Sequence, residues 1–111
     1  MTEHRLVSLS GVVRGWGDLS RGHDDGGHDP ITVTGQVVSS YQEAGRLAFV
    51  MLSDETAELQ VILTASRLGA DQYEEAAACP VGERLSAQGH VTRTRRGVLS
   101  IVATAVSLAD E

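Results

Sequence analysis

The chain has 111 residues, a formal net charge of −6 at pH 7 and a single cysteine. This length suits one domain with one modest core, and a hydrophobic content of 41% excludes a chain that is disordered by composition. Cys79 can form no internal disulfide, which fits a reducing compartment. The acidic balance argues against broad, charge-driven binding to nucleic acid, so any such site must be a local patch.

The sequence shows neither a membrane span nor an export signal. No apolar run approaches the roughly 18 residues of a transmembrane helix. The N-terminus lacks the basic start and the apolar stretch of a signal peptide. We therefore expect a cytoplasmic protein that does not associate with membranes.

Residues 1–30 are rich in glycine and polar residues and show no periodicity, which predicts an irregular arm. A short strand around residues 6–13 is an alternative for part of this arm. Trp16 is expected to pack the arm against the rest of the domain.

The arm ends in a cluster of imidazole and carboxylate groups, which are good ligands for zinc or manganese. The cluster consists of His23, Asp24, Asp25, His28 and Asp29. Its spacing matches no closed metal motif. We therefore interpret it as a polar loop, and we expect neither a metal nor another cofactor.

The sequence after Pro30 predicts five strands and one helix. Alternating apolar and polar residues favour strands over 31–41, 46–53 and 57–64. The next segment, residues 66–80, is rich in Ala and Glu, lacks β-branched residues and ends at a proline, which favours a helix. Alternation returns over 82–94 and 98–108, and residues 109–111 form an acidic tail. Gly35 inside the first strand predicts a bulge or a close backbone approach.

The order of three strands, one short helix and two strands predicts an all-β fold. It matches the five-stranded Greek-key barrel known as the OB-fold, which carries one short helix between its third and fourth strands. A simple sandwich would not need that helix, and a fold of βαβ units would need more helices. We therefore predict an OB-fold domain over residues 31–108.

The predicted hairpin of residues 46–64 sorts its side chains onto two faces, because side chains alternate along a strand. One face is purely apolar and predicts the core: Val50, Leu52, Leu59, Val61 and Leu63. The other face carries Phe49 and Gln60. On the outer face of an OB-fold, a ring can stack on a base and an amide can hydrogen-bond to a base edge. Two alternatives stay open: Phe49 faces the core, or it lies outside beneath the arm.

Basic and aromatic residues flank this outer face. Arg93, Arg95 and Arg96 lie around the predicted turn between the last two strands, and Arg46 opens the second strand. Four guanidinium groups on one rim could hold a few phosphates, and the alternative is a solvated turn. Tyr41 is a candidate second ring at the rim, with a half-buried strand residue as the alternative.

Two stretches, "VTGQVVSS…GRLAFVMLSDETAELQVIL" and "VGERLSAQGHVTRTRRGVLSI", resemble the anticodon-binding OB domain of class II aminoacyl-tRNA synthetases. The lysyl type is most similar, with the aspartyl and asparaginyl types near, and the resemblance covers about residues 31–108. It implies that Phe49 stacks on the central anticodon base and that Gln60 helps to read that base.

Two polar residues of that family are replaced in this chain. An Arg late in the first strand corresponds to Ser40 or Tyr41, and the Glu of the family's "GELSI" corresponds to Val98. Each good polar pair with a base is worth about 1–3 kcal/mol. We therefore expect weaker discrimination between bases than the resemblance alone implies.

Two functional hypotheses follow. The first is a nucleic-acid-binding module that engages tRNA or single-stranded RNA or DNA weakly. The second is an interaction module whose outer face is covered by a protein partner or a second copy, through Leu47, Phe49, Met51, Ile62 and Val98. Because the resemblance does not extend to a synthetase catalytic domain, we expect no enzymatic activity from this chain alone, be it a free-standing protein, a fragment or a subunit.

Overall fold

The computed structural model describes residues 5–17, 31–43 and 46–108. The histidine and aspartate cluster of residues 23–29 and the acidic tail of residues 109–111 lie outside these ranges. The described elements are β1 (Arg5–Leu6), α1 (Leu9–Trp16), β2 (Ile31–Glu43), β3 (Leu47–Ser53), β4 (Glu58–Thr64), α2 (Ala65–Leu68), α3 (Ala70–Ala77), β5 (Arg84–Arg93) and β6 (Leu99–Leu108).

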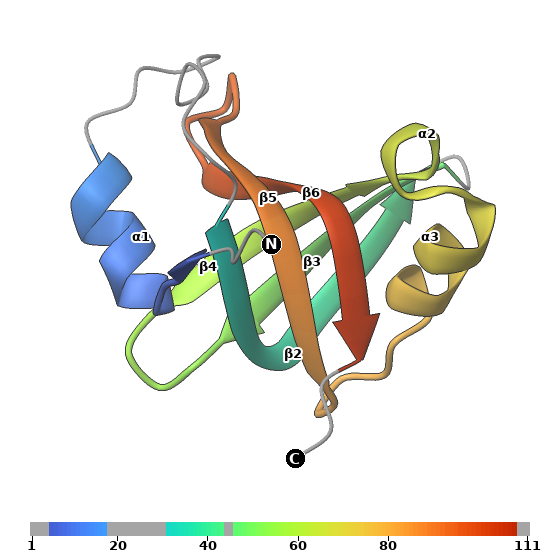
Figure 1. The fold of residues 1–111 in the computed structure, drawn as a ribbon, viewed down its shortest axis with the longest axis horizontal. Helices are drawn as coiled ribbons and strands as arrows, with labels where there is room; N and C mark the ends of the chain where they lie inside the picture. Colours follow the sequence, from blue (N-terminus) through green and yellow to red (C-terminus); the bar gives the residue numbers. More distant parts are fainter. Residues whose placement is uncertain (1–4, 18–30, 44–45, 109–111) are drawn as a thin grey trace.

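Five of the strands close into a barrel. They follow the order β2–β3–β4–β6–β5, and β5 pairs back onto β2. Within the barrel, β2 pairs with two strands, because residues 31–36 pair with β5 and residues 36–43 pair with β3. The short strand β1 also pairs with residues 31–32 of β2, in parallel. Figure 1 shows α1 on one side of this barrel and α2 and α3 on the other. The architecture confirms the predicted five-stranded barrel with its helical segment between the third and fourth barrel strands.

Gly35 lies just before β2 changes partner. A Cβ atom at this position would stand 3.0 Å from the Ser53 carbonyl oxygen and 3.1 Å from the Leu52 Cβ. Such contacts are tighter than packed side chains normally make, so glycine lets β2 approach β3 without displacing it. An irregularity in the β2–β3 ladder follows between Val37 and Ser39. The prediction of a close backbone approach at Gly35 is confirmed.

The interior of the barrel is apolar. The five hairpin residues predicted for the core are each at most 2% exposed. Other strands add Val33, Val37, Leu85, Val91 and Ile101, all fully buried. Phe49 lies on the opposite face of β3, between the buried Ala48 and Val50. This arrangement excludes the alternative in which Phe49 faces the core.

The helical segment between β4 and β5 is split by Gly69, whose φ of 83° no helix accommodates. Tyr73 and Ala76 of α3 turn into the apolar core. Cys79 follows α3 and is also buried; burial raises the pKa of its thiol, and the negative charge of Glu83 adds to this shift. A thiol in this state is a poor nucleophile, so we interpret Cys79 as a packing residue.

The prediction of an irregular arm is wrong for residues 9–16, and so is the alternative of a strand over residues 6–13. Residues 9–16 form helix α1 although Gly11 and Gly15 disfavour a helix locally. Ser8 caps the helix by accepting the Gly11 N–H at 3.0 Å. Trp16 packs against the core, as predicted, and together with two fully buried helix residues it anchors α1 on the barrel. These two residues are Leu9 and Val12.

Asp54, in the β3–β4 turn, holds the start of α1. Its Oδ2 accepts the Leu9 N–H at 2.8 Å, and its Oδ1 accepts the backbone N–H groups of Thr56 and Ala57 at 2.9 and 3.2 Å. Burial raises the pKa of the Asp54 carboxyl, but these bonds and one from the Thr56 hydroxyl outweigh burial and bring it below the ordinary value. The side chain that orders α1 thus lies 45 residues away in sequence.

No helix in the described ranges is long and apolar enough to cross a membrane. Within the same residues, no three His, Cys, Asp or Glu side chains gather in an arrangement that could hold a metal ion.

Candidate functional site

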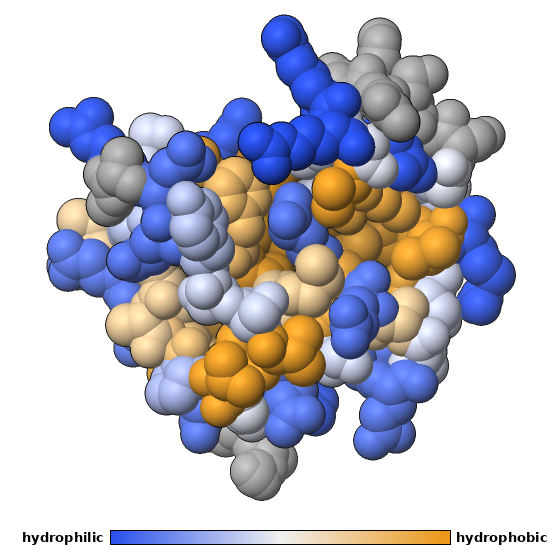
Figure 2. Space-filling view, turned by 180° about the vertical axis from the view of Figure 1, so that it is seen from behind, coloured by the Kyte–Doolittle hydropathy of each residue, from blue (hydrophilic) through white to orange (hydrophobic). Residues whose placement is uncertain are grey.

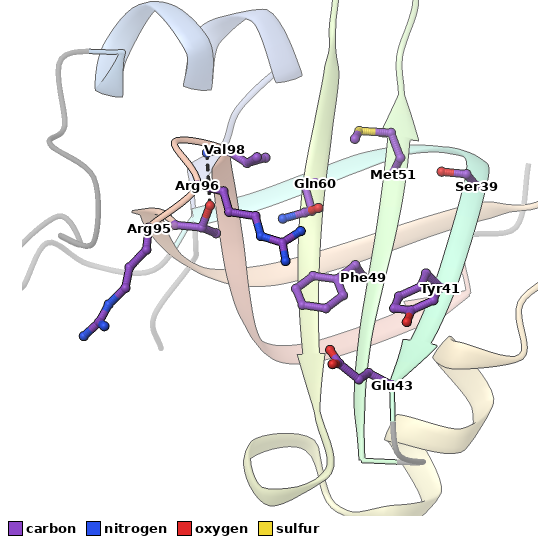
Figure 3. Close-up of a pocket in the computed structure, with 10 residues that line it drawn as sticks. Ser39, Tyr41, Glu43, Phe49, Met51, Gln60, Arg95, Arg96 and Val98 are labelled. Atoms are coloured by element: carbon purple, nitrogen blue, oxygen red, sulfur yellow. Dashed lines mark hydrogen bonds between the residues drawn. The ribbon is translucent and has the colours of Figure 1, made fainter.

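An open cleft of about 700 Å³ lies on the outer face of the barrel. β2, β3, β4 and the turn between β5 and β6 contribute to it (Figure 3). Figure 2 views the molecule from behind and shows apolar side chains in the middle of the face, between hydrophilic ones. The cleft is lined by Ser39, Tyr41, Glu43, Phe49, Met51, Gln60, Thr94, Arg95, Arg96 and Val98.

Strand alternation places these side chains together. Successive side chains point to opposite faces, so residues 39, 41 and 43 of β2 share the outer face with residues 49 and 51 of β3. Gln60 of β4 stands on the same face, opposite Met51 in the β3–β4 register. The sequence-based assignment of Phe49 and Gln60 to one outer face is therefore correct.

Two aromatic rings lie side by side in the cleft. Tyr41 and Phe49 are directly opposite each other in the β2–β3 register. Their ring centroids are 6.5 Å apart and their planes differ by 24°. Tyr41 is 62% exposed, which rules out the alternative of a half-buried strand residue. Phe49 is half-buried on the same face. Near-parallel rings that line an open cleft offer flat π surfaces on which another flat group can stack.

Gln60 is held by the strand beside it. Its Nε2 donates to the Oγ of Ser100 on β6 at 2.9 Å. The Ser100 hydroxyl in turn donates to the Val98 carbonyl oxygen at 3.2 Å. Ser100 is fully buried, whereas the Gln60 side chain reaches the cleft. The amide is thus one polar group with a fixed position beside the two rings.

The turn between β5 and β6 is fastened by its own hydrogen bonds. The Thr94 N–H donates to the Val98 carbonyl at 2.9 Å, and the Val98 N–H donates to the Thr94 Oγ1 at 3.0 Å. Gly97 supplies the positive φ of 92° that the turn requires. The backbone that carries Arg95 and Arg96 is therefore anchored next to the cleft.

The three arginines near this turn have different surroundings. Arg93 donates from Nη1 to the Gly97 carbonyl at 2.8 Å and from Nη2 to the Gly17 carbonyl at 2.9 Å. These bonds join the turn to the end of α1, and Arg93 does not line the cleft. Arg95 and Arg96 are exposed, and within the described ranges their guanidinium groups make no hydrogen bond or ion pair. Figure 3 shows Arg96 extending over the cleft towards Phe49, whereas Arg95 points away.

Arg46 is exposed at the start of β3 and does not line the cleft. Of the seven residues singled out from the sequence, the structure thus brings five together and leaves Arg46 and Arg93 apart. The five are Tyr41, Phe49, Gln60, Arg95 and Arg96.

Sequence reasoning missed three polar residues of the cleft: Ser39, Glu43 and Thr94. The alternation that selects Tyr41 also selects its neighbours two positions away, so the signal for Ser39 and Glu43 was present. Glu43 sets up a charge contrast, because its carboxylate stands at one end of the cleft and two arginines stand at another (Figure 3). Val98, which is 37% exposed, adds an apolar wall.

Comparison with known proteins agrees with this geometry. A family model described as an OB-fold nucleic acid binding domain, of the tRNA anti-codon type, matches residues 31–109. A chloroplastic/mitochondrial lysine–tRNA ligase of Arabidopsis thaliana is 33% identical over 81 residues, which are 72% of this chain and 13% of that protein.

Two bacterial lysine–tRNA ligases are each 29% identical to this chain. The protein of Xylella fastidiosa strain 9a5c matches over 73 residues, 66% of this chain and 14% of that protein. The protein of Streptococcus pneumoniae strain Hungary19A-6 matches over 90 residues, 81% of this chain and 18% of that protein. The chain therefore spans less than a fifth of the length of these relatives. Since the family model covers most of the chain, this protein belongs to the tRNA anti-codon family of OB-fold nucleic acid binding domains.

Proposed function

We propose that this chain is a nucleic-acid-binding module that engages single-stranded RNA or DNA weakly, without catalysis. The observation that carries the proposal is the Tyr41–Phe49 ring pair, in which Tyr41 is exposed and Phe49 is half-buried, in an open cleft that Arg96 overhangs. Because the relatives are lysine–tRNA ligases, a tRNA anticodon loop is the first ligand to test. Aminoacylation belongs to those whole proteins, of which this chain spans a small part.

Stacking supplies most of the affinity in this proposal. Every base has a π face, and stacking of a base on an aromatic side chain contributes about 1–3 kcal/mol. The rings of Tyr41 and Phe49 stand on neighbouring strands, so two successive unstacked bases can each find a ring. This mode suits a single strand, in which bases are free to turn outward.

Phosphate contacts contribute less. Of the described residues that line the cleft, Arg95 and Arg96 carry positive charge. Contacts with one or two phosphates would give a slope of log K against log salt of about −0.7 to −1.4 for a single strand. The carboxylate of Glu43 opposes this attraction, and the net charge of −6 opposes it further.

Base selectivity should be modest. Where the related synthetase domains carry an arginine and a glutamate, this chain carries Ser40 or Tyr41 and Val98. Neither replacement at those places can supply the charged hydrogen bonds of the original residue. Among the described residues that line the cleft, Gln60 is left as the one side-chain amide that can read a base edge.

Fluorescence anisotropy tests the proposal. Labelled anticodon stem-loop RNA, single-stranded RNA and single-stranded DNA are titrated with the protein at low and at moderate salt. We expect binding that weakens with salt along the shallow slope given above and that is weakened at least severalfold in Phe49→Ala. Val81→Ala is the matched control, because Val81 is 66% exposed and does not line the cleft. An absence of binding at low salt would refute the proposal.

A second candidate is an interface with another protein chain, including a second copy of this one. Val98 and Met51 make part of the cleft apolar, and this favours burial against a partner. Sedimentation equilibrium distinguishes the two candidates. Self-association that survives high salt and is abolished by Phe49→Ala would support the second, whereas a monomer at all concentrations would remove the case for a dimer.

A further inference from the structure

Ser100 stands out because it is a serine that is fully buried in an otherwise apolar core. It lies on β6 directly beside Gln60 of β4, in the parallel β4–β6 register. A buried hydroxyl is costly unless it is hydrogen-bonded. Ser100 has two partners, Gln60 and the Val98 carbonyl, and both belong to residues that line the cleft.

The order of protons in this chain of bonds is set by chemistry. The Val98 carbonyl oxygen can only accept, so the single hydroxyl proton of Ser100 is directed to it. The Ser100 oxygen then has only lone pairs left for Gln60, and lone pairs need a donor. Gln60 must therefore present Nε2 to Ser100, as the 2.9 Å bond shows. An amide that presents its nitrogen inward turns its oxygen the other way.

We propose that Ser100 is a positioning residue that fixes which end of the Gln60 amide meets a base. The inference deepens the proposed function and rests on it. With Nε2 tied to Ser100, Gln60 offers the cleft Oε1 as an acceptor and its second amide hydrogen as a donor, in one fixed order. A free amide would offer both orders and would favour no base edge. Stacking on Tyr41 and Phe49 supplies affinity in this scheme, and Ser100 supplies selectivity through Gln60.

The test separates affinity from selectivity. Anisotropy titrations with oligo(A), oligo(C) and oligo(U) of equal length are run on the wild type, Ser100→Ala, Gln60→Ala and the double variant. We expect the wild type to distinguish the best from the worst oligomer by about fivefold or more. In Ser100→Ala the three affinities should converge while binding persists. In the Gln60→Ala background, Ser100→Ala should change nothing further.

A measurement on the wild type guards against a folding defect in the variant. In NMR spectra of the unliganded protein, one of the two Gln60 side-chain amide hydrogens should exchange slowly with solvent and show a nuclear Overhauser effect to Ser100. Fast and equal exchange of both hydrogens would overturn the inference, because the amide would then be free.

The titrations distinguish failure of the inference from failure of the proposed function. If the wild type binds none of the oligomers, both are overturned. If it binds all three equally, or if Ser100→Ala keeps the wild-type preference, the inference alone is overturned. An equal loss from Ser100→Ala with and without Gln60 would show a purely structural role and would also overturn it.

Discussion

The two sides of the barrel use their polar side chains in opposite ways. Beside α1, the Asp54 carboxylate accepts hydrogen bonds from backbone N–H groups and from the Thr56 hydroxyl. In the cleft, Arg95, Arg96 and the Glu43 carboxylate make no hydrogen bond or ion pair with any described part of the chain. Polar groups that are hydrogen-bonded within the fold contribute to its stability. Polar groups without such partners are available to bind a ligand.

The same contrast appears inside a single turn. Arg93 and Arg96 are three residues apart, and both carry a guanidinium group near the β5–β6 turn. The Nη atoms of Arg93 donate hydrogen bonds to the carbonyls of Gly97 and Gly17, so Arg93 links the end of α1 to the barrel. Arg96 extends over the aromatic pair (Figure 3). Residue type alone therefore does not separate a structural arginine from a binding one.

The largest expected effect is on binding, in Phe49→Ala. Removing the ring removes one stacking surface, and affinity for a single strand should fall by about 1–3 kcal/mol, or roughly 5- to 150-fold. Stability should change little, because Phe49 lies outside the core. Anisotropy measures the first quantity and thermal unfolding the second. A Phe49→Ala variant that is strongly destabilised, yet binds with unchanged affinity when folded, would contradict this prediction.

The second effect is on stability, in Asp54→Ala. Losing the carboxylate leaves the Leu9 N–H and the turn N–H groups without their acceptor, which should cost about 1–2 kcal/mol. Urea unfolding measures the loss. Binding of the folded variant should equal that of the wild type, and weakened binding would show that the two sides are coupled.

The same carboxylate predicts how stability depends on pH. Its pKa is lower in the folded state than in the unfolded chain, so the unfolded state binds the proton more readily. The Asp54 contribution should be complete above about pH 4, near the unfolded value, and should be lost as the pH falls through the folded pKa. The free energies of unfolding of the wild type and of Asp54→Ala should therefore converge as the pH falls from neutral to acidic. A constant gap would contradict this origin.

A smaller effect should separate Arg96→Ala from Arg93→Ala. Removing Arg96 should weaken binding several-fold and reduce the salt slope by about 0.7, the value for one phosphate contact on a single strand. Removing Arg93 should lower thermal stability, because it frees the Gly17 and Gly97 carbonyls. Paired anisotropy and unfolding experiments on both variants decide this. Identical behaviour of the two would break the distinction between them.

The smallest effect should be a gain, in Glu43→Gln. The variant keeps the shape of the side chain but removes a negative charge from the cleft, so single-strand binding should tighten by about twofold at low salt. Glu83→Gln removes the same charge outside the cleft and is the matched control. Weaker binding of Glu43→Gln would mean that this carboxylate accepts hydrogen bonds from the ligand.

The strands and the outer face were predictable because they depend on local alternation. The apolar set Val50, Leu52 and Leu59 and the opposite pair Phe49 and Gln60 follow from a period of two residues. The structure confirms both sets. The same rule, continued along β2 from Tyr41, would have included Glu43 in the candidate site.

Helix α1 and the role of Arg93 were not predictable in this way. Apolar residues do recur at helical spacing over residues 9–16, and Ser8 is a typical N-cap, but the two glycines weaken this local signal. The start of the helix is also held by Asp54 from a distant turn. The bonds of Arg93 depend on where the Gly17 carbonyl lies, 76 residues away in sequence. The role of Arg93 therefore depends on a tertiary contact, and tertiary contacts add to a weak local signal in α1.

The most direct test of the central claim is a map of backbone amide shifts during titration with a single-stranded RNA oligomer. We predict that the changes concentrate on the outer-face positions of β2, β3 and β4 and on the β5–β6 turn, with Tyr41, Phe49 and Gln60 among the largest. Amides of α1 and of the Asp54 turn should stay in place. Changes centred on α1, with Phe49 and Gln60 undisturbed, would contradict the account.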